Sequence, residues 1–134
     1  MTTNPTSTKT GACLCGAVRF ESEKVPAEAG ICHCEQCRRW TGVALMGVTV
    51  PTESIRWSGA EHIARIQSSE WAERAWCGKC GTNLFYRVTA DHGWAGGTEL
   101  QVGRFDDPNG FALKNEVFIA QKQSRFGSRG ATDR

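Results

Sequence analysis

Residues 32–42 read Cys-His-Cys-Glu-Gln-Cys-Arg-Arg-Trp-Thr-Gly and place three cysteines within six positions. Two further cysteine pairs lie on either side of this stretch, as Cys-Leu-Cys at residues 13–15 and as Cys-Gly-Lys-Cys at residues 77–80. Such pairs suit a tetrahedral zinc ion, because a tight turn can bring two sulfurs within about 2.3 Å of one metal. Two pairs complete one closed site, so the seven cysteines leave three over. A structural zinc takes four protein ligands, whereas a catalytic zinc typically takes three and leaves one position open.

Two other interpretations of the cysteines are weaker. Disulfide scaffolds usually have an even number of cysteines and a secretory signal. This chain has seven cysteines, and residues 1–10 lack the apolar core of such a signal. A redox Cys-x-x-Cys motif is followed by a helix, but residues 84–88, Leu-Phe-Tyr-Arg-Val, are typical of a strand. We therefore expect zinc at one cluster at least, and a cytoplasmic location.

Length and charge exclude several classes of partner. The chain of 134 residues has the size of one domain. Its net charge is +2, and the basic excess falls in residues 122–134. The rest of the chain does not offer the clustered cations that nucleic acids require. No apolar run approaches the roughly 20 residues of a membrane span. We expect neither nucleic acid nor a membrane as a partner.

The chain divides into three expected parts: a disordered leader (residues 1–10), a single zinc-binding β domain (residues 11–121) and a mobile basic tail (residues 122–134). Within the domain, short alternating or β-branched runs between glycines predict strands. We place these strands at residues 17–22, 43–50, 55–57, 62–66, 71–76, 82–88, 99–103 and 116–120. Residues 34–40 can form a single helical turn. The predicted fold class is mainly β, with few or no helices.

Four segments together carry a family resemblance. They are residues 11–20 with Cys-x-Cys-Gly, residues 32–42, residues 76–84 (Trp-Cys-Gly-Lys-Cys-Gly-Thr-Asn-Leu), and the weaker Val-Gly-Arg-Phe-Asp-Asp-Pro at 102–108 with the late strand. In this order and spacing they resemble the glutathione-dependent formaldehyde-activating enzyme family, which includes centromere protein V-like domains. The resemblance covers nearly all of the expected domain.

The resemblance implies a fold, two metal sites and an activity. The implied fold is a zinc-stabilised β-tent of small antiparallel sheets. Family members close a structural zinc site with the first and last cysteine pairs, which are Cys13, Cys15, Cys77 and Cys80 in this chain. The middle cluster would hold a second zinc with Cys32, Cys34 and Cys37. The implied activity is that of a carbon–sulfur lyase resembling S-(hydroxymethyl)glutathione synthase, which joins or splits glutathione, or another small thiol, and formaldehyde or a related aldehyde.

One departure from the family concerns the late strand. Relatives often carry a proline and a histidine just before it, where this chain has Leu113 and Glu116. If that histidine helps to bind substrate in the relatives, its absence bears on the identity of the substrate more than on the fold.

Three thiolates and one zinc ion carry a net charge of about −1, and a thiol that coordinates the metal is ionised. The thiolate is the nucleophile in sulfur chemistry. A fourth thiolate would add negative charge, so we expect nearby cations to offset it. Arg38 and Arg39 are the candidates, and either can also hold a substrate carboxylate. Glu35 is the candidate base. His33 lies between two ligands, so in an extended segment its side chain points away from the metal.

Two other functions stay open at this point. One is a non-catalytic zinc-scaffolded interaction module, since a fold does not fix a function. The other is a thiol-based metal or redox sensor. The expected partner of the leading hypothesis is a small-molecule thiol or a thiol–aldehyde adduct. Short edge strands are also compatible with a homodimer.

Overall fold

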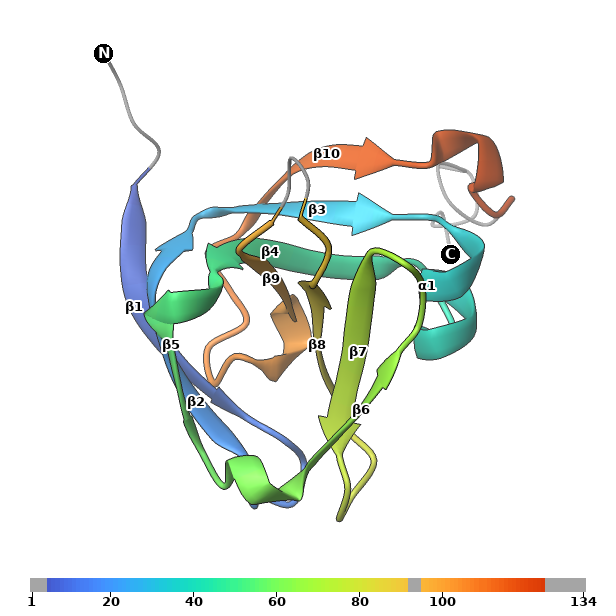
Figure 1. Cartoon of the computed structure of the whole chain (residues 1–134). Helices are drawn as coiled ribbons and strands as arrows, with labels where there is room; N and C mark the ends of the chain where they lie inside the picture. Colours follow the sequence, from blue (N-terminus) through green and yellow to red (C-terminus); the bar gives the residue numbers. More distant parts are fainter. Residues whose placement is uncertain (1–4, 92–94, 125–134) are drawn as a thin grey trace, which may run out of the picture.

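The computed structural model describes residues 5–91 and 95–124, which form two β-sheets and one α-helix (Figure 1). The smaller sheet lies on the left of Figure 1 and has the order β1-β2-β5. Its strands, all antiparallel, are β1 (Thr6–Ala12), β2 (Arg19–Pro26) and β5 (Ile55–Ser58).

The larger sheet has seven strands in the order β10-β3-β4-β9-β8-β7-β6. Neighbouring strands are antiparallel except β3 and β10, which are parallel. The sheet is strongly twisted, since β3 and β10 run across the page in Figure 1 and β7 runs down it. The bounds of its strands are β3 (Glu28–Cys32), β4 (Leu45–Pro51), β6 (Ile63–Gln67), β7 (Ala72–Cys77), β8 (Asn83–Val88), β9 (Gly97–Gln101) and β10 (Ala112–Val117).

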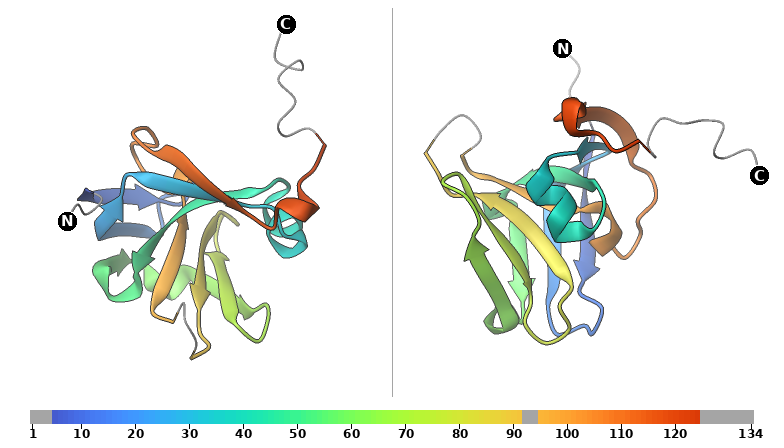
Figure 2. Two further views of the ribbon diagram at one scale, coloured as in Figure 1. Left: turned by 90° about the horizontal axis from the view of Figure 1, so that it is seen from above. Right: turned by 90° about the vertical axis from the view of Figure 1, so that its right-hand side faces the viewer.

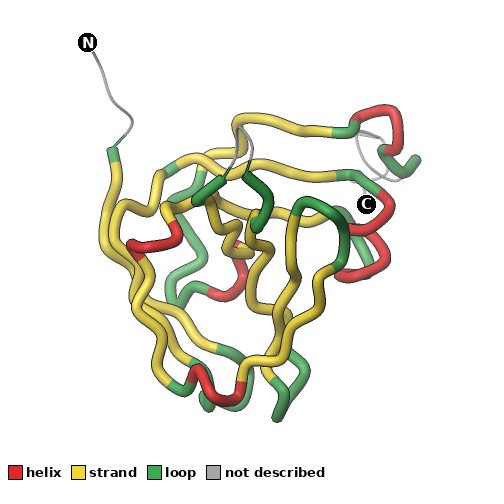
Figure 3. Tube along the Cα trace, in the orientation of Figure 1, coloured by secondary structure: helices red, strands yellow, loops and turns green. Residues whose placement is uncertain are grey.

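The helix α1 (Glu35–Thr41) follows β3 after two residues and faces the viewer in the right-hand view of Figure 2. Cys34 caps its N-terminus with an extended backbone, and the Cys34 sulfur accepts a hydrogen bond from the Cys37 N–H at 3.3 Å. Gly42 ends the helix with a φ of 84°, a left-handed conformation that glycine adopts readily. Figure 3 shows that helical segments are otherwise short. They are the 3-10 turns η1 (Thr52–Ser54), η2 (Ala60–His62), η3 (Val102–Arg104) and η4 (Ile119–Gln121).

The hydrophobic core lies between the two sheets. Val48 of β4 and Leu100 of β9 contribute to it from the larger sheet, and both side chains are fully buried. The Trp57 ring of the smaller sheet packs between Phe20 and Phe85, with ring centroids 5.4 and 5.2 Å away. This aromatic row joins β2 and β5 to β8, so it fixes one sheet against the other.

Polar side chains occupy the opposite face of the larger sheet. Successive residues of a strand point to opposite faces, and the register places Arg74, Tyr86, Glu99 and Thr49 side by side across β7, β8, β9 and β4. Helix α1 packs against this face. The contact is made by Trp40 of the helix, whose ring centroid lies 5.0 Å from the Arg74 guanidinium. The sheet therefore has one face in the core and one face available for a site.

The predicted fold class is confirmed, since the described chain is mainly β with one α-helix. The helical turn expected at residues 34–40 is α1, and each predicted strand has a counterpart within a few residues. The parallel pair of β3 and β10 is a departure from the all-antiparallel sheets that the family resemblance implied.

Three predictions of local structure were wrong. Residues 6–10 belong to β1 and not to a disordered leader, because their backbone groups pair with β2. Residues 28–32 form β3, which was not predicted. The last strand ends at Val117, before the left-handed Phe118 (φ 57°), and not at residue 120. Residues 1–4 of the expected leader and residues 125–134 of the expected tail lie outside the described residues.

Candidate metal centres

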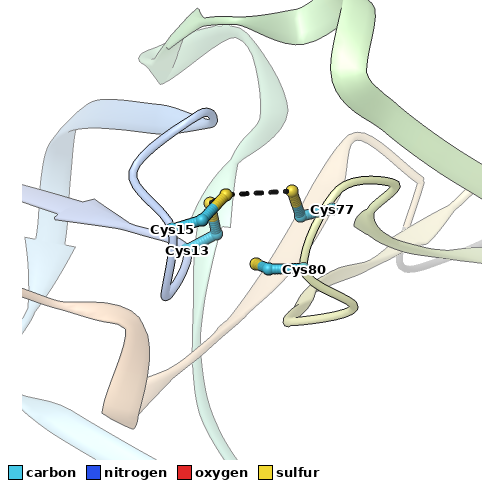
Figure 4. A group of neighbouring side chains, drawn as sticks. All are labelled: Cys13, Cys15, Cys77 and Cys80. Carbon is cyan, nitrogen blue, oxygen red and sulfur yellow. Dashed lines mark hydrogen bonds between the residues drawn. The ribbon is translucent and has the colours of Figure 1, made fainter.

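Four cysteines from two distant turns meet between the two sheets (Figure 4). Cys13 and Cys15 lie in the turn that follows β1, whereas Cys77 ends β7 and Cys80 lies in the turn before β8. The four sulfurs lie within 4.8 Å of one another, and in Figure 4 they point toward a common centre.

Each turn is shaped by hydrogen bonds from backbone N–H groups to sulfur. The Val18 N–H donates to Cys13 Sγ and the Lys79 N–H donates to Cys77 Sγ, each at 3.3 Å. The chain then reverses at a glycine in each turn, Gly16 with φ 81° and Gly81 with φ 82°. These positive φ values explain why glycine follows the second cysteine of both pairs.

The four-cysteine cluster (Cys13, Cys15, Cys77 and Cys80) fits a tetrahedral metal ion. The sulfurs of Cys13 and Cys15 are 3.6 Å apart, and those of Cys15 and Cys77 are 3.9 Å apart. A tetrahedral ion with metal–sulfur bonds of about 2.3 Å places its sulfurs about 3.8 Å apart. A hydrogen bond from the Thr82 hydroxyl, 3.1 Å away, lowers the pKa of Cys80 to about 5, so one thiolate is present at neutral pH.

A second cluster, the three-cysteine cluster, consists of Cys32, Cys34 and Cys37, whose sulfurs also lie within 4.8 Å of one another. Cys32 is the last residue of β3, Cys34 caps α1, and Cys37 lies in the first turn of the helix. In the described part of the chain no fourth cysteine, histidine or carboxylate joins this group. A hydrogen bond from the Cys37 thiol lowers the pKa of Cys32 to about 6, and the same contact raises the pKa of Cys37.

A buried arginine contacts the three-cysteine cluster from the sheet. Arg74 of β7 is only 5% exposed, and its Nη1 and Nη2 lie 3.8 and 3.7 Å from Cys37 Sγ. Its guanidinium lies 5.0 Å from the ring centroid of Trp40 on α1 and 4.8 Å from that of Tyr86 on β8. Cationic side chains over aromatic faces are attracted to them. Helix and sheet therefore hold this charge against the sulfur.

The polar face continues away from Arg74 through two groups whose pKa values burial raises, the Tyr86 hydroxyl and the Glu99 carboxyl. The Thr49 hydroxyl donates a hydrogen bond of 2.8 Å to Glu99 Oε1. The thiolate of Cys32 in the three-cysteine cluster further raises the pKa of both groups. Tyr86 and Glu99 therefore belong to the same electrostatic environment as this cluster.

Comparison with known proteins identifies the family. A family model described as glutathione-dependent formaldehyde-activating enzyme matches residues 8–121. The chain belongs to this family. An uncharacterized lyase of Schizosaccharomyces pombe is 34% identical over 79 residues, which cover 59% of this chain. The match spans only 57% of that relative's length.

A solved structure supports the same fold. The crystal structure of a Rhodobacter sphaeroides protein matches with a TM-score of 0.62 and 27% identity, over 75% of this chain and 90% of that chain.

Among the described residues no helix has the length and apolar character needed to cross a membrane.

In this member of the glutathione-dependent formaldehyde-activating enzyme family, the seven cysteines form the two groups that the resemblance implied, one of four and one of three. The charged residues after Cys37 are placed differently from the expectation. Arg39 Nε and Glu35 Oε2 form an ion pair of 2.8 Å on the exposed side of α1, and Arg39 lowers the pKa of Glu35. Arg38 is partly exposed. The cation in contact with a cysteine of this cluster is Arg74, which was not among the predicted residues.

His33 lies outside the cluster, as its extended segment predicted. Its side chain is fully buried, and Nε2 lies 2.8 Å from Oε1 of Glu116 on β10. Lys122 Nζ lies 3.4 Å from the same oxygen. Glu116, the residue that departs from the family pattern, therefore anchors the parallel strand β10 next to β3.

Native mass spectrometry of freshly purified, reduced protein is expected to find two metal ions per chain, because both clusters offer thiols at ligand spacing. Mild chelation should remove one ion first, since three protein ligands hold a metal less securely than four. A single ion in freshly purified protein, with no uptake of a second on titration, would contradict the second centre.

Proposed function

We propose that this protein is a zinc-dependent carbon–sulfur lyase that joins or splits a small thiol, with glutathione as the candidate, and formaldehyde or a related aldehyde. Family membership and the similarity to a protein named as a lyase support this class of activity. The alternative of a zinc-scaffolded interaction module has no observation in its favour among the described residues.

The observation that carries the proposal is the difference between the two clusters. The four-cysteine cluster supplies the complete ligand set of a structural zinc. The three-cysteine cluster supplies one ligand fewer, which is the pattern of a catalytic zinc. It also lies on the polar face of the larger sheet, next to Arg74 and away from the hydrophobic core.

The residues present fit zinc, because three thiols within 4.8 Å of one another are soft ligands at the spacing that a tetrahedral ion needs. When bound, zinc would act as a Lewis acid that favours the thiolate form of a thiol substrate. Cys32, Cys34 and Cys37 would hold the ion, and Arg74 would offset the negative charge of the sulfurs.

In the direction of synthesis, the substrate sulfur adds to the carbonyl carbon of the aldehyde. A carbon–sulfur bond forms, the carbon–oxygen π bond opens, and the thiol proton is exchanged through water onto the new hydroxyl oxygen. The reverse reaction breaks the carbon–sulfur bond and returns thiol and aldehyde. Tyr86 stays protonated at neutral pH, since burial raises its pKa, so its hydroxyl can donate a hydrogen bond on this face. Catalytic roles for Glu35, Arg38 and Arg39 stay predictions.

Two-dimensional exchange NMR on glutathione and formaldehyde tests the proposal directly. We expect the zinc-loaded protein to accelerate exchange between free glutathione and its hydroxymethyl adduct, and the zinc-stripped protein to lose this acceleration. Readdition of zinc should restore it. Exchange at the rate of buffer alone, with both centres loaded, would exclude formaldehyde with glutathione as the substrate pair.

A further inference from the structure

We propose that Arg74 makes the three-cysteine centre select an anionic, thiolate ligand over a neutral one at its open position. This inference rests on the function proposed above and names the residue that determines ligand class. Arg74 acts through Cys37 and the local charge, so it is a positioning residue.

The geometry of Arg74 leaves it one orientation. Two of its nitrogens face the same sulfur, Cys37 Sγ, at 3.8 and 3.7 Å. Trp40 and Tyr86 lie within 5.0 Å of its guanidinium carbon, as measured to their ring centroids. Because Arg74 as a whole is 5% exposed and its guanidinium is planar, these contacts hold the guanidinium inside the structure. A lysine in this place would present a single point charge on a flexible stem.

Charge then distinguishes the ligands. Three thiolates around a divalent ion carry a net charge of about −1, and a thiolate at the fourth position brings it to about −2, whereas a neutral ligand leaves it unchanged. Charges interact more strongly in a buried site than in water. A fixed positive charge beside Cys37 therefore stabilises the complex with a thiolate more than the complex with a neutral ligand.

Two other basic residues of this region are engaged with carboxylates, and Arg38, which follows Cys37, is partly exposed. Arg39 is largely exposed and pairs with Glu35, and Lys122 lies next to Glu116. Glu99 on the same face is an acid and supplies no positive charge, and burial raises its pKa. Within residues 5–91 and 95–124, Arg74 is the arginine that has a hydrogen bond to a sulfur of this cluster.

The experiment uses the full chain loaded with cobalt(II), whose visible absorption changes when a thiolate joins the metal. Wild-type protein is titrated with glutathione, with 2-mercaptoethanol and with imidazole, which is a neutral ligand. We expect Arg74→Met to weaken the binding of both thiols about 10- to 100-fold, the range expected when one charge is removed from a partly buried site. The affinity for imidazole should change less than about threefold, so the ratio of the affinities is the readout.

Two variants control for structural damage. Arg87 of β8 forms an ion pair with the buried Glu73 of β7, the strand that also carries Arg74. Arg87→Met removes this ion pair and leaves the cysteines unchanged. It should lower stability without altering the thiol-to-imidazole ratio. Arg74→Lys keeps the charge and should recover part of the thiol affinity. If Arg74→Met does not fold, Arg74→Lys replaces it in the test. Loss of the planar guanidinium alone should weaken the binding of thiols and leave the binding of imidazole unchanged. Retention of metal in the four-cysteine cluster shows that each variant is folded.

The outcomes separate the two proposals. If Arg74→Met weakens the binding of thiols and of imidazole equally, Arg74 has only a structural role and the inference is overturned. The lyase proposal stands in that case. If the wild-type protein binds no thiol at cobalt, both proposals fail. A loss of affinity confined to the two thiols supports the inference. If the affinity for 2-mercaptoethanol falls as much as the affinity for glutathione, the preference is for the thiolate sulfur and not for the rest of glutathione.

Discussion

Replacing Cys77 with serine is expected to unfold the protein. Cys77 is fully buried and belongs to the same hydrophobic core as Phe85 and Leu100. It is also one of the four sulfurs that join the turn after β1 to the turn between β7 and β8. A structural zinc contributes about 10–16 kcal/mol in small domains, which is comparable to the roughly 5–15 kcal/mol by which most domains are stable.

Circular dichroism and zinc content measure this effect together. We expect Cys77→Ser to lose its cooperative thermal transition and the metal of the four-cysteine cluster. Cys15→Ser is the matched control, because Cys15 is exposed and its replacement removes no packing. The same loss in Cys15→Ser assigns the effect to the metal and not to the core. If Cys15→Ser melts at the wild-type temperature, the four-cysteine cluster does not hold the fold together.

The cysteine groups could be predicted because their spacing along the chain encodes local turns. A turn of two or three residues places neighbouring sulfurs together whatever the rest of the fold does. Two strands beside the last cysteine pair were also predicted. The run Leu-Phe-Tyr-Arg-Val is typical of a strand and lies in β8, and β7 was placed as the segment that leads into the pair. Counting alone predicted one group of four and one of three, but the assignment of each cysteine to a group needed the resemblance, since three clusters allow more than one pairing.

The strands that were missed lack the usual pattern. Residues 6–10 of β1 are polar and mostly exposed, so their strand exists because β2 satisfies their backbone hydrogen bonds. β3 begins Glu-Ala-Gly, and a Cβ atom at Gly30 would lie 2.3 Å from Asn115 Oδ1, so a larger residue there would displace the Asn115 side chain. Contacts with a strand more than 80 residues away, as between Glu116 and Ile31, cannot be seen in a short window of sequence.

Arg74 shows the same limit for the candidate site. Sequence proximity to Cys37 favoured Arg38 and Arg39, whereas the arginine that contacts its sulfur is 37 residues away on β7. The available signal was a charged pair, Glu73 and Arg74, inside a strand that ends in Cys77. Successive residues of a strand face opposite sides, so one of the two had to lie on the face that receives α1.

Replacing Cys34 with serine is expected to abolish lyase activity while the fold remains. Cys34 is one of three sulfurs in the open cluster, so the variant retains two ligands. Loss of groups that merely orient a ligand weakens metal binding about 10- to 100-fold, so loss of a ligand should exceed 100-fold. Exchange between glutathione and its adduct should then proceed at the rate of buffer.

The fold should survive because serine can replace the second role of Cys34. The Cys34 sulfur caps α1 by accepting a hydrogen bond from the Cys37 N–H, and serine is among the preferred N-cap residues. We expect a melting temperature within about 5 °C of the wild type and one remaining zinc ion per chain. Gln36→Ala, an exposed change on the same helix, should keep both zinc ions and the activity. If Cys34→Ser instead unfolds like Cys77→Ser, the second centre is structural, and the interaction module becomes the better account of this chain.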